Sequence, residues 1–311
     1  MLACQSNIAD AHRPSSPGEK LGASYLTVRK TVVRVLISAD AEGITGITST
    51  NELLFGKPHY EFMREMMTAD VNAAVVGAFD GGATEVVVND SHWTMTNVLL
   101  ERLDPRADLI KGFHKHLCMV EGARETDAVF FLGYHCRTGD SDGVGNETIL
   151  GREIVEIRMN GRPVGESEIN AAICGELGVP VIFASGDNLY EKELRETLPA
   201  VEYGLTKYAL DRWTARCLSP ARSRANIQQA AQRAVERGRR GEFQPYLVKG
   251  MVKLTVTFSS TAEALMASLD PGSRRESPRT VMYQATNAID AWKGFFAVLL
   301  LGWTATDEIY G

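Results

Sequence analysis

The sequence is poor in cysteine, lacks a positive net charge and has no long apolar run, and each absence argues against a class of protein. Its 311 residues include five cysteines without CxxC spacing, so neither a disulfide framework nor a zinc finger is indicated. The formal net charge of -6 disfavours a nucleic-acid partner, because phosphate binding requires a clustered basic face. The apolar run near the C-terminus, Phe295 to Trp303, is far shorter than the roughly 20 residues that cross a bilayer. We therefore expect a cytoplasmic protein with neither a nucleic-acid nor a membrane partner.

The patterns that are present indicate an α/β fold. Residues 31–39 form a nearly continuous run of Val, Leu and Ile, which is typical of a strand covered on both faces. Residues 62–79 carry apolar side chains at helical spacing, and further apolar runs end near Asn89, Tyr134 and Ser185. Strands that alternate with helices predict a doubly wound, mostly parallel sheet with helices on both faces.

The organisation of the chain changes at its start and again in its last third. Residues 1–30 lack apolar periodicity and are predicted to be a flexible tail. Asn160-Gly161 lies between two short strand-like runs, which is a hairpin signal. After about residue 205 a long helical segment precedes one alternating strand and a final strand and helix. We therefore predict a metal-binding α/β domain at 31–205 and a smaller C-terminal α+β subdomain at 206–311.

Charged and imidazole side chains gather where the predicted strands end. Asp40 and Glu42 follow the first strand, His92 the second and His135 the fourth, while Glu166 opens the helix after the hairpin. In an open parallel sheet these ends converge on the ligand-binding edge. Each residue alone has a structural explanation, as a cap, a core histidine or a first-turn acid. Together, carboxylates and imidazoles are the ligands that zinc prefers, and a carboxylate can bridge two metal ions.

Several sequence blocks occur in an order that carries a family resemblance. They include "SADAEGITGI", "GATEVVVNDSHWTMTN", "FFLGYHCR", "NGRPVGE", "INAAICGELGVPV" and "RCLSPARS", and they cover nearly everything from residue 31 onward. In these blocks the chain resembles the zinc-dependent D-aminopeptidases, peptidase family M55, of the dipeptide-operon type. The resemblance implies two zinc ions per chain, a small-molecule or short-peptide substrate and a homo-oligomer, with a decamer expected. It also implies a ligand set, which in this chain is Asp40, Glu42, His92, His135 and Glu166.

One position departs from the family pattern. The family uses a histidine eleven residues beyond the histidine of the "GYH" block, where this chain reads "HCRTGDSDGVGNETI". Counting without a gap places Asn146 there, and allowing one inserted residue places Glu147 there. Glu147 is a candidate general base, because a carboxylate can accept a proton at neutral pH. His114 or His116 of "KGFHKHLCM" is a second candidate, although surface histidines are the simpler explanation of that segment.

Two hypotheses of different class follow from these residues. The first is a di-zinc metallohydrolase that cleaves an amide bond, in small peptides with an N-terminal D-residue or in a related small amide. The second is a family member that binds metal and a ligand without catalysis. Hydrolysis rates against a panel of amides, with and without chelator, distinguish the two.

Overall fold

The larger of two sheets forms the centre of the molecule. The computed structural model describes residues 33–139 and 141–305, so the predicted tail at 1–30 lies outside the described residues. Across this sheet the strands are β3 (Ala107–Ile110), β2 (Glu85–Asp90), β1 (Arg34–Ala39), β4 (Ala128–Leu132), β7 (Val181–Asp187), β8 (Glu202–Asp211) and β9 (Thr214–Cys217). All neighbouring pairs are parallel except β8 and β9. This sheet confirms the predicted mostly parallel α/β architecture.

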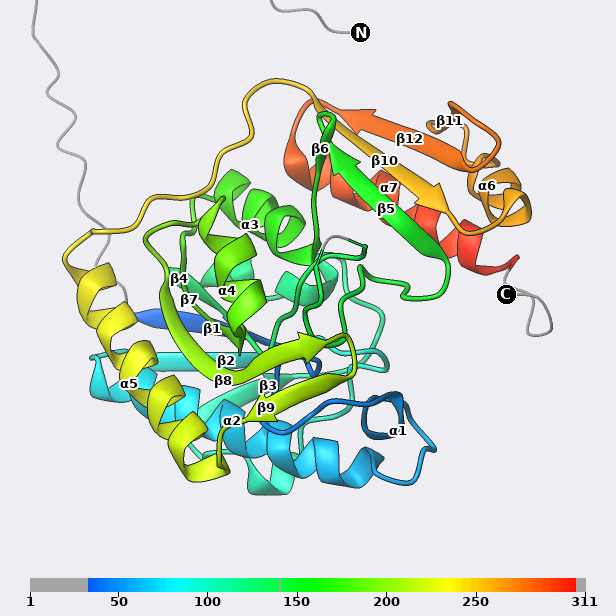
Figure 1. The fold of residues 1–311 in the computed structure, drawn as a ribbon. Coiled ribbons are helices and arrows are strands. Elements are labelled where there is room, and N and C mark those ends of the chain that lie inside the picture. Colours follow the sequence, from blue (N-terminus) through cyan, green and yellow to red (C-terminus); the bar gives the residue numbers. More distant parts are fainter. Residues whose placement is uncertain (1–32, 140, 306–311) are drawn as a thin grey trace, which may run out of the picture.

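Both faces of this sheet are buried, because successive residues of its central strands enter two different cores. Val35 and Ile37 of β1 pack in one apolar cluster, whereas Leu36 between them packs in the other. The helices α2 (Tyr60–Asp80) and α5 (Pro220–Arg239) lie side by side over the first face (Figure 1). Residues of α3 (Glu166–Glu176) and α4 (Asn188–Arg195) belong to the core of the second face.

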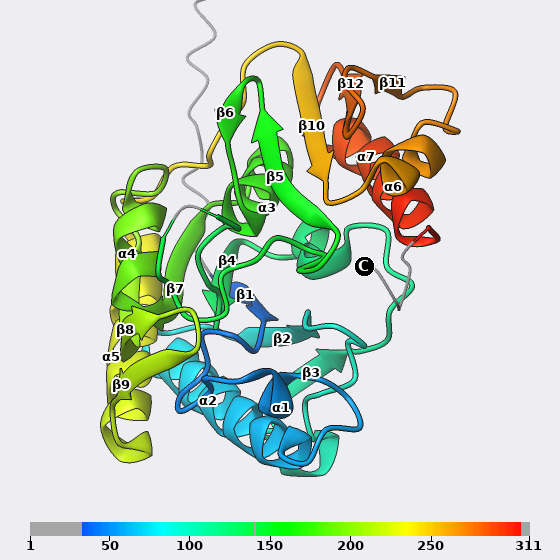
Figure 2. The same ribbon diagram turned by 45° about the vertical axis from the view of Figure 1, so that its right-hand side comes forward.

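The second sheet is antiparallel and lies beyond the second face. Its strands, in order, are β11 (Arg274–Arg275), β12 (Thr280–Ala285), β10 (Val252–Phe258), β5 (Ile154–Met159) and β6 (Arg162–Pro163). Helices α6 (Thr261–Ala267) and α7 (Ala288–Trp303) pack against β10 and β12 of this sheet (Figure 2). The remaining short elements are α1 (Thr50–Leu53) and 3-10 turns at Leu100–Arg102, Cys118–Val120 and Ala123–Glu125.

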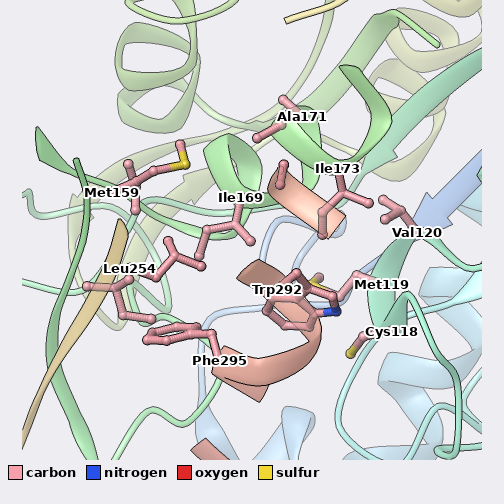
Figure 3. Packing of buried hydrophobic residues seen from close by; sticks show 14 of the residues in the cluster. Cys118, Met119, Val120, Met159, Ile169, Ala171, Ile173, Leu254, Trp292 and Phe295 are labelled. Carbon is pink, nitrogen blue, oxygen red and sulfur yellow. The ribbon is translucent and has the colours of Figure 1, made fainter. Parts of the chain in front are cut away.

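Helix α7 joins the second sheet to the rest of the molecule. Trp292 and Phe295 are buried, and they pack among Ile169 and Ile173 of α3 and Leu254 of β10 (Figure 3). Burying two aromatic side chains of this size stabilises the contact by several kcal/mol, at about 25 cal/mol per Å² of apolar surface. The apolar run near the C-terminus is therefore the core-facing helix that joins the two sheets. Among the described residues, no helix is long and apolar enough to cross a membrane.

The predicted domain boundary near residue 205 does not coincide with a break between the two sheets. That residue lies inside β8, a member of the larger sheet, and β9 and α5 after it also belong to the larger unit. The predicted hairpin forms, but β5 pairs with β10 of the second sheet, with Ile157 opposite Val256. A half-buried strand such as β10 needs partners on both edges, and the hairpin supplies one of them.

Candidate metal centre

The loop after β1 carries two of the predicted ligands across the end of β4. The backbone N–H of Asp40 donates to the Leu132 carbonyl at 2.8 Å, and that of Gly43 donates to the Gly133 carbonyl at 2.7 Å. A Cβ atom on Gly43 would overlap the carbonyl oxygen of Tyr134, so only glycine permits this approach. The Asp-Ala-Glu-Gly sequence thus places Asp40 and Glu42, both buried, over the carboxyl end of β4.

Both predicted histidines are oriented by backbone carbonyl groups. His92 Nε2 lies 3.1 Å from the Leu53 carbonyl oxygen, and His135 Nδ1 lies 3.0 Å from that of Cys136. Because a carbonyl oxygen only accepts hydrogen bonds, these nitrogens carry the protons. The opposite nitrogens, His92 Nδ1 and His135 Nε2, face the carboxylates, where each can hold a proton or, once that proton is lost, offer a lone pair to a metal ion. This is the arrangement by which proteins orient metal-binding histidines.

Glu166 is fixed by the start of α3, of which it is the first residue. Its Oε1 accepts a hydrogen bond from the Ile149 backbone N–H at 2.7 Å. Its other oxygen, Oε2, lies 3.3 Å from His135 Nε2. The positive end of the helix dipole favours a charged carboxylate at this position.

The five side chains form two groups that share Asp40. In one group Asp40 Oδ1 and Glu42 Oε2 each lie 3.2 Å from His92 Nδ1. In the other, Asp40 Oδ2 lies 3.2 Å from His135 Nε2, beside Glu166. Within each group the possible ligand atoms lie within 4.8 Å of one another. A carboxylate with one oxygen in each group is the geometry expected of a bridge between two cations.

Several atoms that face the centre of this cluster make no well-aligned hydrogen bond within the described residues, although nitrogen and oxygen atoms of the cluster lie 3.2 to 3.3 Å apart. They are Asp40 Oδ2, Glu42 Oε2, His135 Nε2 and Glu166 Oε2, all of them buried. A buried polar atom without a partner costs about 1–3 kcal/mol, and a charged one costs more. Divalent cations would satisfy all four atoms, so the residues present fit a metal centre.

The electrostatics of the cluster show how strongly it attracts a positive charge. Burial raises the pKa of Asp40, and the nearby charge of Glu42 raises it further. Burial lowers the pKa of His92 and His135, but the carboxylates around them outweigh burial and hold each pKa well above its ordinary value. Without metal, protons occupy the places that metal ions would take, so metal and proton compete for the same atoms.

Four residues are candidates to replace the histidine that the family uses, and of these Glu147 lies beside the cluster. Its Oε1 lies 3.8 Å from His135 Nε2, and its Oε2 is buried without a hydrogen-bond partner. Burial and the charge of Glu166 raise the pKa of Glu147 well above its usual range. Asn146 instead donates its amide to the Ser141 carbonyl. His116 and its neighbour His114 are exposed, and no ion pair within the described ranges joins either to the carboxylates.

One residue at this centre has no counterpart in the sequence predictions. Lys207 of β8 is fully buried, and its Nζ donates to the backbone carbonyls of Glu42, Ile44 and Ile47. Burial lowers the pKa of Lys207 to about 8, which still leaves the ammonium charged at neutral pH. No motif marked it, because a lysine in a strand is ordinarily exposed.

Known proteins are similar to this chain in fold and in sequence. The family model described as D-aminopeptidase, Peptidase_M55, matches residues 33–297. A D-aminopeptidase of Bacillus subtilis (strain 168) is 33% identical over 268 residues, which cover 86% of this chain and 96% of that protein. A solved structure, the "Zn-dependent D-aminopeptidase DppA from Bacillus subtilis, a self-compartmentalizing protease", superposes with a TM-score of 0.84 at 32% identity. The superposition covers 88% of this chain and all of that chain. The chain therefore belongs to the D-aminopeptidase family, peptidase family M55.

Proposed function

We propose that this protein is a zinc-dependent amide hydrolase that acts on short peptides with an N-terminal D-residue. The observation that carries the proposal is the shared carboxylate of Asp40, which has one oxygen in each of two ligand groups. The likeness to a zinc-dependent D-aminopeptidase supports zinc as the metal and peptides as the substrate class. We assign Glu42 and His92 to one zinc ion, His135 and Glu166 to the other, and Asp40 to both.

The residues around the centre account for the chemistry of amide hydrolysis. When bound, zinc lowers the pKa of a coordinated water molecule and polarises a carbonyl oxygen. We assign to Glu147 the transfer of a proton from the attacking water to the leaving nitrogen, and the 3.8 Å distance from its Oε1 to His135 Nε2 supports this role. Burial and the charge of Glu166 raise the pKa of Glu147, and a raised pKa makes a carboxylate a stronger base.

The oligomeric state and the compartment belong to the same proposal. The solved relative is described as self-compartmentalizing, which supports a homo-oligomer here, and we propose a decamer. Large apolar side chains such as Phe55, Leu210 and Leu247 are 72%, 66% and 62% exposed and are suited to subunit contacts. A cytoplasmic location agrees with the four described cysteines, all of which are unpaired.

Metal analysis and peptide hydrolysis test the proposal together. We expect about two zinc ions per chain, and loss of metal in Asp40→Asn and His92→Ala. The metal-loaded protein should release the N-terminal residue from D-Ala-Ala faster than from L-Ala-Ala, and chelator should abolish both rates. Full metal content in both variants would show that the ligands are wrongly assigned. A loaded wild-type protein that hydrolyses no peptide or small amide would instead support the non-catalytic, metal-binding alternative.

A further inference from the structure

The loop that bears Asp40 and Glu42 is held from one side by β8. Thr206 Oγ1 donates to the Gly43 carbonyl at 2.7 Å. Lys207 Nζ donates to the carbonyl of Glu42 at 2.5 Å, and to the carbonyls of Ile44 and Ile47 at 3.0 and 2.5 Å. Three carbonyl oxygens of one eight-residue loop (residues 40–47) therefore converge on a single ammonium group.

The charge of Lys207 is directed at this loop and not at an acidic side chain. The residue is fully buried, and no ion pair within the described part of the chain joins it to a carboxylate. Burying an ammonium group is expensive unless every proton is satisfied, and here the three protons have three carbonyl acceptors. The positive charge attracts the oxygen ends of the three carbonyl dipoles, and one of these carbonyls belongs to the metal-ligand candidate Glu42. A neutral side chain would leave three carbonyl groups with their oxygens crowded together.

Other contacts hold the opposite side of the same loop. The backbone N–H groups of Asp40 and Gly43 donate to carbonyls at and just beyond the end of β4, and the N–H of Thr45 donates to Asp70 Oδ2 at 2.9 Å. These contacts do not involve Lys207. Removing the ammonium should therefore free the carbonyls of Glu42, Ile44 and Ile47 while Thr206 and the N–H contacts still hold the loop, which alters the loop without unfolding the protein.

We propose that Lys207 is a positioning residue for the metal centre, which fixes the loop so that Asp40 and Glu42 reach their cations together. This inference rests on the proposed metal site and adds a determinant of its affinity. Lys207 acts through the loop backbone and touches neither the substrate nor the metal. It supplies for the carboxylate ligands the support that the Leu53 and Cys136 carbonyls supply for the histidines.

The test compares Lys207→Met with a destabilised control. Methionine keeps a similar length and removes the charge, whereas Leu254→Ala leaves a cavity in the second sheet. Zinc affinity is measured by competition with a chromophoric chelator, and Co²⁺ absorption reports ligand geometry. We expect zinc affinity of Lys207→Met to fall by about 10- to 100-fold, the usual effect of removing a group that orients a ligand. Its Co²⁺ spectrum should change, and the rise of Tm on metal addition should shrink.

The control should show the opposite pattern. Leu254→Ala should lower the Tm of the metal-free and metal-loaded protein alike, with unchanged affinity and Co²⁺ spectrum. The inference fails if Lys207→Met behaves in this way. If Lys207→Met does not fold, Thr206→Val takes its place, since it removes only hydroxyl hydrogen bonds and should weaken zinc binding in the same direction. A wild-type protein that binds no metal overturns the proposed function as well, whereas unchanged affinity in a metal-binding variant overturns this inference alone.

Discussion

At the scale of single residues, the proposed role of Glu147 as general base can be tested by substitution. We predict that Glu147→Gln keeps its zinc and its fold but lowers peptide turnover by about 10²- to 10⁴-fold, the usual contribution of a general base. Steady-state hydrolysis of D-Ala-Ala, with metal content measured on the same samples, checks this. His116→Ala is the matched control, and we expect it to be nearly silent because the side chain is exposed.

The reverse pattern would move the proton-transfer role to the segment that contains His116. An inactive His116→Ala together with an active Glu147→Gln would give that result. Glu147→His restores the residue type that the family uses, so a gain in D-aminopeptidase activity would show that this position alone had diverged.

The sequence could predict those residues of the centre whose side chains are typical metal ligands. Asp40, Glu42, His92, His135 and Glu166 are carboxylates and imidazoles at strand ends or a helix start, and the structure brings all five together. Lys207 could not be predicted in this way. Its role depends on β8 lying beside the loop after β1, which is a contact between residues about 160 positions apart. Local patterns carry no information on such a pairing.

At the scale of elements, the turn after β1 depends on one glycine. We predict that Gly43→Ala loses zinc, because a Cβ atom would push the loop away from the Tyr134 carbonyl and separate Asp40 from Glu42. The clash should also cost about 1–3 kcal/mol of stability. Zinc content and urea denaturation, measured together, check the two effects.

A second glycine supplies the control for this element. Gly250 has a φ of 76°, and no atom lies within 4 Å of the place that a Cβ would take, so Gly250→Ala is strained without touching the centre. It should lose about 1 kcal/mol of stability and keep all of its zinc. Equal loss of zinc in the two variants would mean that general destabilisation, not the turn, governs metal binding.

The elements themselves follow from sequence more closely than their partners do. Apolar runs and helical spacing predict β1, β2, β4, α2 and α7 near their observed bounds, because burial on one or both faces is a local pattern. The hairpin of β5 and β6 is also predicted, from Asn160-Gly161. The pairing of this hairpin with β10 cannot be predicted from the sequence, because any half-buried strand offers the same edge hydrogen bonds. Sheet membership is therefore decided by tertiary packing.

At the scale of the whole molecule, stability and metal binding are linked through protons. The folded protein raises the pKa of His92 and His135 well above the ordinary value of 6.5, with carboxylates outweighing burial. In the metal-free protein this pairing stabilises the fold fully below the unfolded-state pKa, and the stabilisation is lost as pH rises through the folded-state pKa. A bound metal ion replaces those protons and avoids this loss.

We therefore predict that the rise of Tm caused by zinc increases with pH from about 6.5 upward, the ordinary pKa of histidine. At low pH, protons on His92 and His135 already pair with the carboxylates. Zinc must displace these protons, so its binding stabilises the fold less. At higher pH the metal-free cluster holds unpaired carboxylates, and zinc at about 1,000 times its Kd contributes roughly 4 kcal/mol.

Thermal unfolding of metal-free and zinc-loaded protein at about pH 6.5, 7.5 and 8.5 measures the effect. His135→Ala should reduce the zinc-induced rise of Tm at every pH, because it removes a metal ligand together with one of the competing protons. A zinc-induced rise of Tm that is the same at all three pH values would show that the metal-free histidines are already neutral, and that the carboxylates do not hold protons in the places that zinc occupies.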